Sequence, residues 1–304
     1  MSQAIRLLRW KTDTGVVSLG IGRGDRIIPV DLMVPETRIA SVAMLQQYCH
    51  ARGQTLSEWA QEALDGSIES VNIRPDQYVI PLELDELWAS GVTYAMSRDA
   101  REAETTSAQS IYARVYEAAR PELFFKAPGS RVVGPEDFVG LREDATCHVP
   151  EPELTVILDH RGDILGYTVG NDMTARDLEG ENPLYLPQTK TYHHSAAIGP
   201  AIVLADTVDP YDLTIAMEIR RRGQPVFEGV TSTTQMRRRI DDLVSYLRRA
   251  WPLAPWTGLM TGTGIVPPDE FGLEAGDEIT IIISEIGTLR NTARIIDSSV
   301  LTTG

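Results

Sequence analysis

Alternating apolar and polar residues open the chain and predict short strands. Residues 4–34 contain three such runs, and glycine-containing turns separate them. A period of two is typical of strands, because successive side chains point to opposite faces. Two stretches with helical spacing follow, residues 37–51 and residues 55–65, and Gly66 ends the second. The pattern thus predicts a small N-terminal α/β domain of residues 1–80.

The rest of the chain, residues 81–304, has a different pattern. Residues 91–120 are mostly helical in their spacing, and residues 234–251 predict one further helix. Apolar runs bounded by Gly, Pro and Asp predict strands, namely TVILD (155–159), ILGYTVGND (164–172), AAIGPAIVLAD (196–206), LTIAMEI (213–219) and EITIIISEI (278–286). Strands and helices do not alternate regularly, so a βαβ repeat is not predicted. We expect a mostly-β, α+β fold in which helices decorate this larger domain.

The charge of the chain narrows its possible partners. Its 304 residues include 28 basic and 43 acidic side chains, which give a formal net charge of −15. A surface this acidic repels nucleic acid and anionic membranes, so neither is expected as a partner. It also repels an anionic ligand, unless a metal ion or local cations reverse the sign of the charge in the site.

Cysteine content and hydropathy point to the cytoplasm. Cys49 and Cys147 are too few for a disulfide framework and lack metal-type spacing. The N-terminal residues lack the apolar core of a signal peptide, which is about 7–15 residues long. No run approaches the roughly 18 apolar residues of a membrane span. We therefore expect a cytoplasmic protein with free thiols.

The segment of residues 150–177 is the most informative one for chemistry. It reads as two antiparallel strands around a two-residue turn at Arg161-Gly162, with His160 opposite Asp163. In that register one face carries only apolar or aromatic side chains, namely Leu154, Val156 and Leu158 against Leu165, Tyr167 and Val169. A slipped register would not give such a face, so the pattern favours this pairing.

The opposite face of the same hairpin gathers carboxylates. Glu151 and Glu153 share it because they are two residues apart, and Asp172 lies directly across from Glu151. Opposed Cβ atoms on paired strands are about 4.5–5.5 Å apart, so the three carboxylates are within reach of one ion. An all-oxygen set without Cys or His favours Mg²⁺, Mn²⁺ or Ca²⁺. The alternative interpretation is a solvated acidic strand face, and the pattern alone leaves it open.

Several motifs in a fixed order resemble the fumarylacetoacetate hydrolase superfamily. They are Glu151-x-Glu153, GYTVGNDMTARD (166–177), the lysine before Gly-Pro in QTKTYHHSAAIGP (188–200), and TGTGIVPP (261–268). The resemblance runs from about Gly91 to the C-terminus. It implies a twisted mixed β-roll with a smaller N-terminal domain, a homodimer or homotetramer, and Mg²⁺ as the usual ion.

Within this superfamily the chain is most similar to the branch of 2-keto-3-deoxy-D-arabinonate dehydratases. The phrases that carry the likeness are GVTYAMSRDAREAE (91–104), PELFFKA (121–127) and RDLEGENPLYLPQTK (176–190). In addition, only 18 residues separate Glu153 from Asp172, where hydrolase members have a longer insertion. The resemblance therefore implies a 2-oxo acid as the substrate.

The resemblance also assigns roles by position. The implied metal ligands are Glu151, Glu153 and Asp172. The implied catalytic candidates are Lys190 and Glu122, for proton transfer. The candidate substrate contacts are Ser97, Arg98, Lys126 and Thr263, of which Arg98 and Lys126 would neutralise the substrate carboxylate.

One departure from the hydrolases bears on the reaction. Hydrolase members carry an Asn-Tyr-x-x-His motif and a Glu shortly after it. In these members the histidine and the glutamate together activate the attacking water. Here the matching stretch, residues 93–97, ends in Ser97. A serine cannot take a proton from water near neutral pH without a base beside it. Glu102 and Glu104 could serve as that base only if their helix turns them inward, and a solvated helix face is the favoured interpretation.

We therefore expect a Mg²⁺-dependent dehydratase that converts a 2-keto-3-deoxypentonate, derived from D-arabinonate or D-xylonate, to 2-oxoglutarate semialdehyde. Such a reaction needs one acid and one base but no activated water. The alternatives are an acylpyruvate- or fumarylacetoacetate-type C–C hydrolase, an oxaloacetate decarboxylase, and a metal-binding protein without turnover.

Overall fold

The computed structural model of the chain describes residues 4–66, 70–95 and 114–297. Its strands are β1 (Arg6–Lys11), β2 (Val17–Arg23), β3 (Arg26–Pro29), β4 (Glu86–Gly91), β5 (Glu122–Pro128), β6 (Phe138–Arg142), β7 (His148–Val149), β8 (Pro152–Asp159), β9 (Ile164–Asp172), β10 (Thr174–Ala175), β11 (Ala196–Leu204), β12 (Thr214–Arg221), β13 (Gln224–Ser232), β14 (Trp256–Met260), β15 (Glu278–Ile283) and β16 (Gly287–Ile296). Its α-helices are α1 (Val30–Met33), α2 (Val42–Ala51), α3 (Leu56–Asp65), α6 (Arg176–Glu181), α7 (Leu186–Lys190) and α8 (Ile240–Leu247). Short 3₁₀ turns include η3 (Pro183–Tyr185) and η5 (Thr233–Gln235). The predicted mostly-β, α+β class is confirmed.

Two packed sheets form the body of the molecule. Within the described residues, the larger sheet has the order β3-β2-β1-β11-β9-β8-β14-β4-β5 and the smaller one β13-β12-β15-β16-β6. One face of the β8–β9 hairpin packs on the smaller sheet, where Val156 shares a core with Ile215 and Ile281. The other side of the larger sheet shares a core with α2 and α3, through residues such as Leu45 and Trp59. Burial of these apolar faces is what holds the sheets and helices together.

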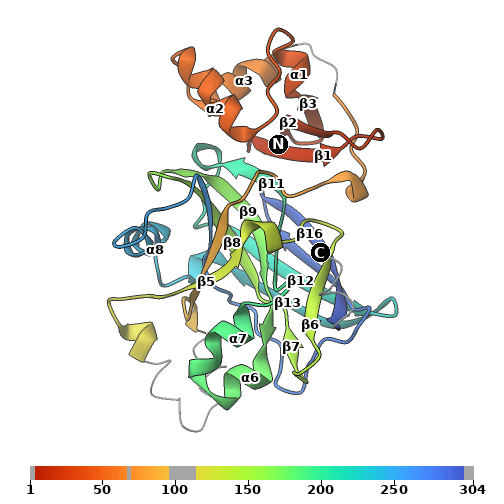
Figure 1. The fold of residues 1–304 in the computed structure, drawn as a ribbon, viewed down its shortest axis with the longest axis vertical. Helices are drawn as coiled ribbons and strands as arrows, with labels where there is room; N and C mark the ends of the chain where they lie inside the picture. Colours follow the sequence, from red (N-terminus) through yellow and green to blue (C-terminus); the bar gives the residue numbers. More distant parts are fainter. Residues whose placement is uncertain (1–3, 67–69, 96–113, 298–304) are drawn as a thin grey trace.

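The N-terminal strands and α1–α3 lie together at the top of Figure 1. The helix predicted at residues 55–65 is present as α3, and a capping box starts it, since Thr55 and Glu58 bond to each other's backbone N–H. The predicted start of the preceding helix at residue 37 is wrong. Ser41 caps α2 by accepting a hydrogen bond from the Met44 N–H, so the helix begins at Val42.

The N-terminal strands extend the larger sheet. β1 pairs antiparallel with β11, so that Arg6 lies opposite Val203. This pairing joins a strand of residues 1–80 to a strand of residues 81–304 in one sheet. The division of the chain into two domains at residue 80 stays a prediction. Among the residues that the structure describes, no helix combines the length and the apolar character needed to span a membrane.

The β8–β9 hairpin has the predicted register near its open end and a different one at its turn. Pro152 to Ile157 pair as expected, for example Glu153 with Gly170. Beyond Ile157 a bulge shifts the pairing, so that Leu158 faces Ile164. The predicted two-residue turn is wrong: Asp159 pairs with Asp163 through a loop of three residues, in which Gly162 has a φ of +80°.

This bulge moves one residue to the other face of the sheet. Leu165 was expected in the core with Leu158, but it packs in the core of α2 and α3. Ile164 packs against the core that contains Leu158 instead. An extra residue in one strand reverses the alternation beyond it, which the period-two pattern alone does not reveal.

The second predicted helix of the larger domain, residues 234–251, is much shorter in the structure. Met236 forms a β-bridge with Tyr94, and the Arg237 N–H donates to the Thr93 carbonyl at 3.0 Å. These backbone groups are thus bonded across the molecule, and α8 covers only Ile240–Leu247. The helix predicted at residues 91–120 does not begin at Gly91, because that residue ends β4. Residues 96–113 of this prediction lie outside the described part of the chain.

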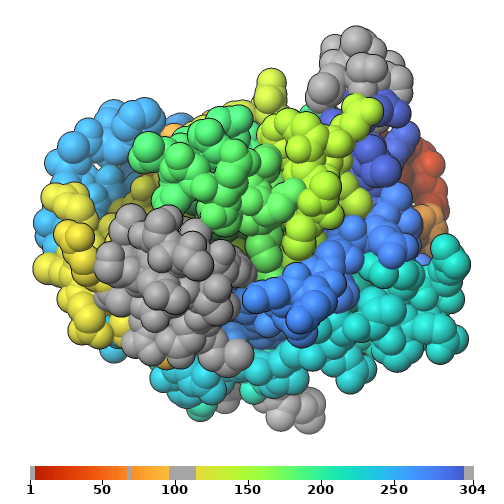
Figure 2. Space-filling view, turned by 90° about the horizontal axis from the view of Figure 1, so that it is seen from below, coloured from red at the N-terminus to blue at the C-terminus, as the bar shows by residue number. Residues whose placement is uncertain are grey.

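The segments that surround the carboxylates meet at one end of the molecule. Figure 2 shows α6 and α7 (green) on the lower face, beside the segment that follows β14 (blue). The Arg176 guanidinium of α6 donates to the Pro267 carbonyl at 2.9 Å and so joins these two segments.

Candidate active site

Three carboxylates converge at the open end of the β8–β9 hairpin. Glu151, Glu153 and Asp172 each offer an oxygen, and these oxygens lie within 4.8 Å of one another. Glu151 and Asp172 exchange both backbone hydrogen bonds, at 3.2 and 2.9 Å, as residues directly opposite each other on paired strands do. The hairpin register therefore brings the predicted ligand set together.

All three of these side chains are buried, which excludes the solvated acidic face. Glu153 is 1% exposed. Burial, together with the charges of Asp172 and Glu151, raises the pKa of Glu153 well above its usual value. The Gly262 N–H donates to Glu153 Oε2 at 2.5 Å. A buried all-oxygen cluster of this kind fits a hard divalent cation such as Mg²⁺, whose charge would offset the mutual repulsion of the acids.

Lys190 ends α7 and points into the cluster. Its ammonium donates to Glu151 Oε2 at 2.7 Å, to Asp172 Oδ2 at 2.8 Å and to Thr174 Oγ1 at 2.6 Å. The side chain is buried. A buried ammonium between two carboxylates partly compensates their charge, so this lysine belongs to the site and not to a surface salt bridge.

Lys126 approaches the same cluster from β5 and is 0% exposed. Its ammonium pairs with Asp172 Oδ1 at 2.5 Å and donates to the carbonyls of Met173, at 2.9 Å, and Lys190. Burial, and secondarily the nearby Lys190 charge, lowers the pKa of Lys126 to about 8, although the Asp172 carboxylate opposes that shift. The structure thus places Lys126 behind Asp172, bonded to the protein itself.

Thr263 and Glu122 lie on segments that border the cluster. The Thr263 hydroxyl accepts from the Ile265 N–H at 3.2 Å and so closes the turn after β14, next to the Gly262 that binds Glu153. Glu122 begins β5 opposite Gly91 of β4. Its carboxylate lies over Gly91, where an added Cβ would be only 2.2 Å from Glu122 Oε2.

The remaining candidates are not placed. Ser97 and Arg98 lie outside the described residues, as do Glu102 and Glu104. Their predicted roles stay predictions.

Two residues near the cluster were not singled out from the sequence. Thr174 accepts a hydrogen bond from Lys190, and its place two residues after Asp172 was a usable signal, because alternation puts both on one face. Tyr94 is buried with a hydroxyl that has no hydrogen-bond partner, and burial and the Glu153 charge raise its pKa. Its match to the tyrosine of the Asn-Tyr-x-x-His motif was a usable signal, and in the fold it forms a β-bridge with Met236.

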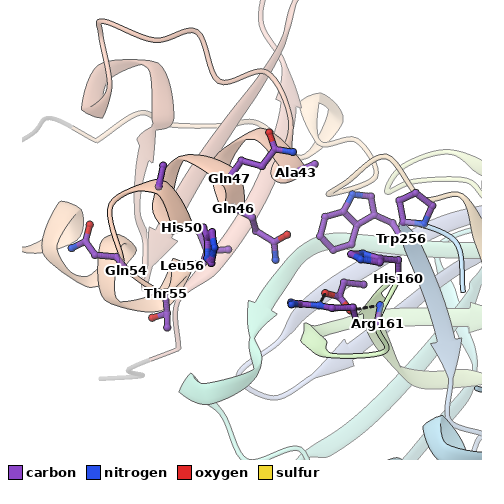
Figure 3. Close-up of a pocket in the computed structure, with 13 residues that line it drawn as sticks. Ala43, Gln46, Gln47, His50, Gln54, Thr55, Leu56, His160, Arg161 and Trp256 are labelled. Atoms are coloured by element: carbon purple, nitrogen blue, oxygen red, sulfur yellow. Dashed lines mark hydrogen bonds and ion pairs between the residues drawn. The ribbon is translucent and has the colours of Figure 1, made fainter.

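A separate cavity of about 770 Å³ lies between α2, α3 and the loop of the β8–β9 hairpin. Figure 3 shows Gln46 and His50 on the helical side, with His160 and Trp256 on the other. None of the predicted site residues lines it, so this cavity is not the candidate active site.

Comparisons with known proteins agree with this geometry. The family description "Fumarylacetoacetate (FAA) hydrolase C-terminal" matches residues 88–294. The chain is 45% identical over 229 residues to a probable 2-keto-3-deoxyxylonate dehydratase of Haloferax volcanii, which covers 73% of this chain and 78% of that protein. It is also 45% identical over 226 residues to the 2-dehydro-3-deoxy-D-arabinonate dehydratase of Saccharolobus solfataricus, covering 73% and 76% of the two chains.

A solved structure has the same fold. It is a 2-keto-3-deoxy-D-arabinonate dehydratase complexed with magnesium and 2,5-dioxopentanoate, and it superposes with a TM-score of 0.78 at 35% identity. The match covers 96% of this chain and all of that one. The fold expected from the sequence motifs is therefore confirmed.

Proposed function

Because the chain belongs to the fumarylacetoacetate hydrolase family, we propose that it is a Mg²⁺-dependent dehydratase of a 2-keto-3-deoxypentonate. The observation that carries the proposal is the buried cluster of Glu151, Glu153 and Asp172 with the Lys190 ammonium bonded inside it. The two dehydratase relatives and the magnesium-containing neighbour support the same chemistry. A protein without turnover would not need a buried lysine among metal ligands.

Glu151, Glu153 and Asp172 would hold the ion, because their carboxylate oxygens converge. Among the described residues, this cluster includes no Cys or His, which are the ligands that softer metals prefer. When bound, Mg²⁺ supplies a Lewis acid for the C2 carbonyl of the substrate and so makes the C3 protons more acidic. The Gly262 N–H orients the Glu153 carboxylate by donating a hydrogen bond to it. The Thr174 hydroxyl orients the Lys190 ammonium by accepting a hydrogen bond from it. An acidic chain can then bind an anionic 2-oxo acid, because the site has local cations.

Lys190 and Glu122 are the proposed pair for proton transfer. One would remove a C3 proton, and the other would protonate the C4 hydroxyl as it leaves as water. This elimination leaves a double bond between C3 and C4, conjugated with the C2 carbonyl. A proton then moves from C5 to C3, and the resulting enol at C4 and C5 tautomerises to an aldehyde at C5, so the product is 2-oxoglutarate semialdehyde. This compound is the 2,5-dioxopentanoate seen with the structural neighbour. Ser97, Arg98 and Thr263 are proposed contacts of the substrate.

Offering two substrates to one Mg²⁺-containing preparation tests this function. We expect 2-keto-3-deoxy-D-arabinonate, or its D-xylonate-derived equivalent, to be dehydrated. The aldehyde product is followed by nicotinamide reduction with a coupled semialdehyde dehydrogenase. An acylpyruvate should be cleaved poorly, as judged by its diketone absorbance, because Ser97 replaces the histidine of the hydrolases. Efficient acylpyruvate cleavage without dehydration would contradict the proposal.

We also propose that the protein forms a homodimer or homotetramer. The outward face of the smaller sheet carries an apolar row across three strands, since Val230 of β13 and Ile282 of β15 both pair with Ala216 of β12. Val230 is 70% and Ile282 48% exposed in the single chain. Exposed apolar rows of this kind fit a protein–protein contact. Cys49 and Cys147 form no disulfide in the described part of the chain, which fits the proposed cytoplasmic location.

A further inference from the structure

The chain contains three lysines, and two of them are buried at the same site. Lys126 and Lys190 lie against the carboxylates, whereas Lys11 is exposed on β1. Arginines make up the rest of its 28 lysine and arginine residues. A lysine ammonium is a compact charge with three donors, which suits a pocket with three acceptors, while the planar guanidinium does not. Each of the two buried ammonium groups thus lies among three acceptor atoms of the protein.

Lys126 makes two hydrogen bonds and one ion pair, all with groups of the protein. Asp172 Oδ1, the Met173 carbonyl and the Lys190 carbonyl surround its ammonium. These partners come from the end of β9 and the end of α7, while Lys126 itself is on β5. Lys126 thus connects three segments behind the carboxylates, and its side chain is fully buried there.

Both groups that Lys126 holds are parts of the proposed machinery. With Oδ1 paired to Lys126, the other oxygen of Asp172 accepts a hydrogen bond from Lys190, which also donates to Glu151. The backbone of Lys190 is fixed through its carbonyl, so its ammonium is placed as well. We propose that Lys126 is a positioning residue for Asp172 and Lys190, not a contact of the substrate. This inference rests on the proposed function, which gives Asp172 and Lys190 their roles.

The split between kcat and KM in Lys126→Met distinguishes the two roles at saturating Mg²⁺. Loss of an outer partner of a metal ligand typically lowers metal affinity or activity by about 10–100-fold. We expect kcat to fall within that range and KM to change by less than about threefold. A KM that rises about tenfold or more with an unchanged kcat would make Lys126 a substrate contact and overturn the inference.

A double substitution tests whether Lys126 acts through Lys190. If it does, turnover of Lys126→Met/Lys190→Met should equal that of Lys190→Met alone within about threefold, because residues that act as a unit are not additive. With Mg²⁺ at saturation, so that weaker metal binding through Asp172 does not limit turnover, multiplied losses would mean that Lys126 does not position Lys190, which contradicts that part of the proposal.

Calorimetric titration with Mg²⁺ gives a readout that needs no substrate. We expect Lys126→Met to weaken Mg²⁺ affinity about tenfold or more, and the exposed control Lys11→Met to leave it unchanged. Lys126→Arg keeps the charge but not the three-acceptor geometry, so it should remain weakened. Full recovery by arginine, or wild-type Mg²⁺ affinity in both Lys126 variants, would overturn the inference. A weakened affinity in a protein that fails to dehydrate the sugar acid would contradict the proposed function alone.

Discussion

Glu153 carries its carboxylate where water does not reach, beside two further acids. Its folded-state pKa is raised well above the ordinary value of 4.5. Because the carboxyl pKa is higher in the folded state, the folded protein binds more protons than the unfolded protein at pH values between 4.5 and the folded-state pKa. The contribution of Glu153 to stability is therefore lost as the pH rises from 4.5 toward its folded pKa. A bound divalent cation should remove this penalty, because it favours the charged form.

This argument predicts the behaviour of Glu153→Gln. In metal-free protein, the melting temperature of the variant relative to wild type should increase as the pH rises above about 4.5. Added Mg²⁺ should raise the melting temperature of wild type and not that of the variant, whose Mg²⁺ binding should be lost in calorimetry. Scanning calorimetry at several pH values, with and without Mg²⁺, measures both effects. A variant that still binds Mg²⁺ like wild type would exclude Glu153 as a ligand.

At the scale of an element, the turn after β14 holds Glu153 through its backbone. Gly262 has a φ of +91°, and an added Cβ there would lie 2.0 Å from Thr93 Oγ1. The same residue donates its N–H to Glu153. Only glycine fits this position, because any larger residue is both strained and in collision with Thr93. The turn thus couples the β14 segment to the metal cluster.

Gly262→Ala should lower both stability and Mg²⁺ affinity. Gly15→Ala is a matched control, since Gly15 has a φ of +81° but nothing within 4 Å of an added Cβ. Both variants carry the backbone strain, about 1–3 kcal/mol, and only Gly262→Ala adds the collision. We expect a larger drop in the free energy of unfolding for Gly262→Ala by about 1–3 kcal/mol, and weaker Mg²⁺ binding in this variant alone. Denaturant unfolding and calorimetry measure the two quantities, and equal effects in both variants would disprove the coupling.

At the scale of the whole molecule, the exposed row on the smaller sheet should bury itself against a second copy. Val230→Glu places a charge in that row, and a buried unpaired charge is unfavourable. We expect sedimentation velocity to find a dimer or tetramer for wild type and a smaller species for the variant. Val16→Glu, at another exposed apolar position, is the control and should not dissociate the assembly. If Val230→Glu sediments like wild type, this row is not the interface.

The sequence by itself determined what depends on local spacing. The carboxylates of Glu151, Glu153 and Asp172 converge because side chains alternate along a strand and because the apolar residues of the hairpin allow one register near the open end. The helix of residues 55–65 was predicted for the same reason, because its apolar spacing and its end at Gly66 are local features. The ordered motifs also identified the family, which a match over residues 88–294 supports.

The tertiary structure alone decided what depends on contacts between distant segments. Three features are of this kind: the bulge that moves Leu165, the β-bridge between Tyr94 and Met236, and the hydrogen bond from Gly262 to Glu153. Each depends on how the strands and the loops between them pack in the folded protein. Lys126 shows the difference most directly. Its residue type suggested a cation for the substrate carboxylate, which stays a prediction, whereas its contacts with Asp172 and two carbonyls, from which we propose a positioning role, come from the fold. A buried ammonium must bond to whatever acceptors the fold supplies, and those acceptors lie on strands and helices that the local sequence does not specify.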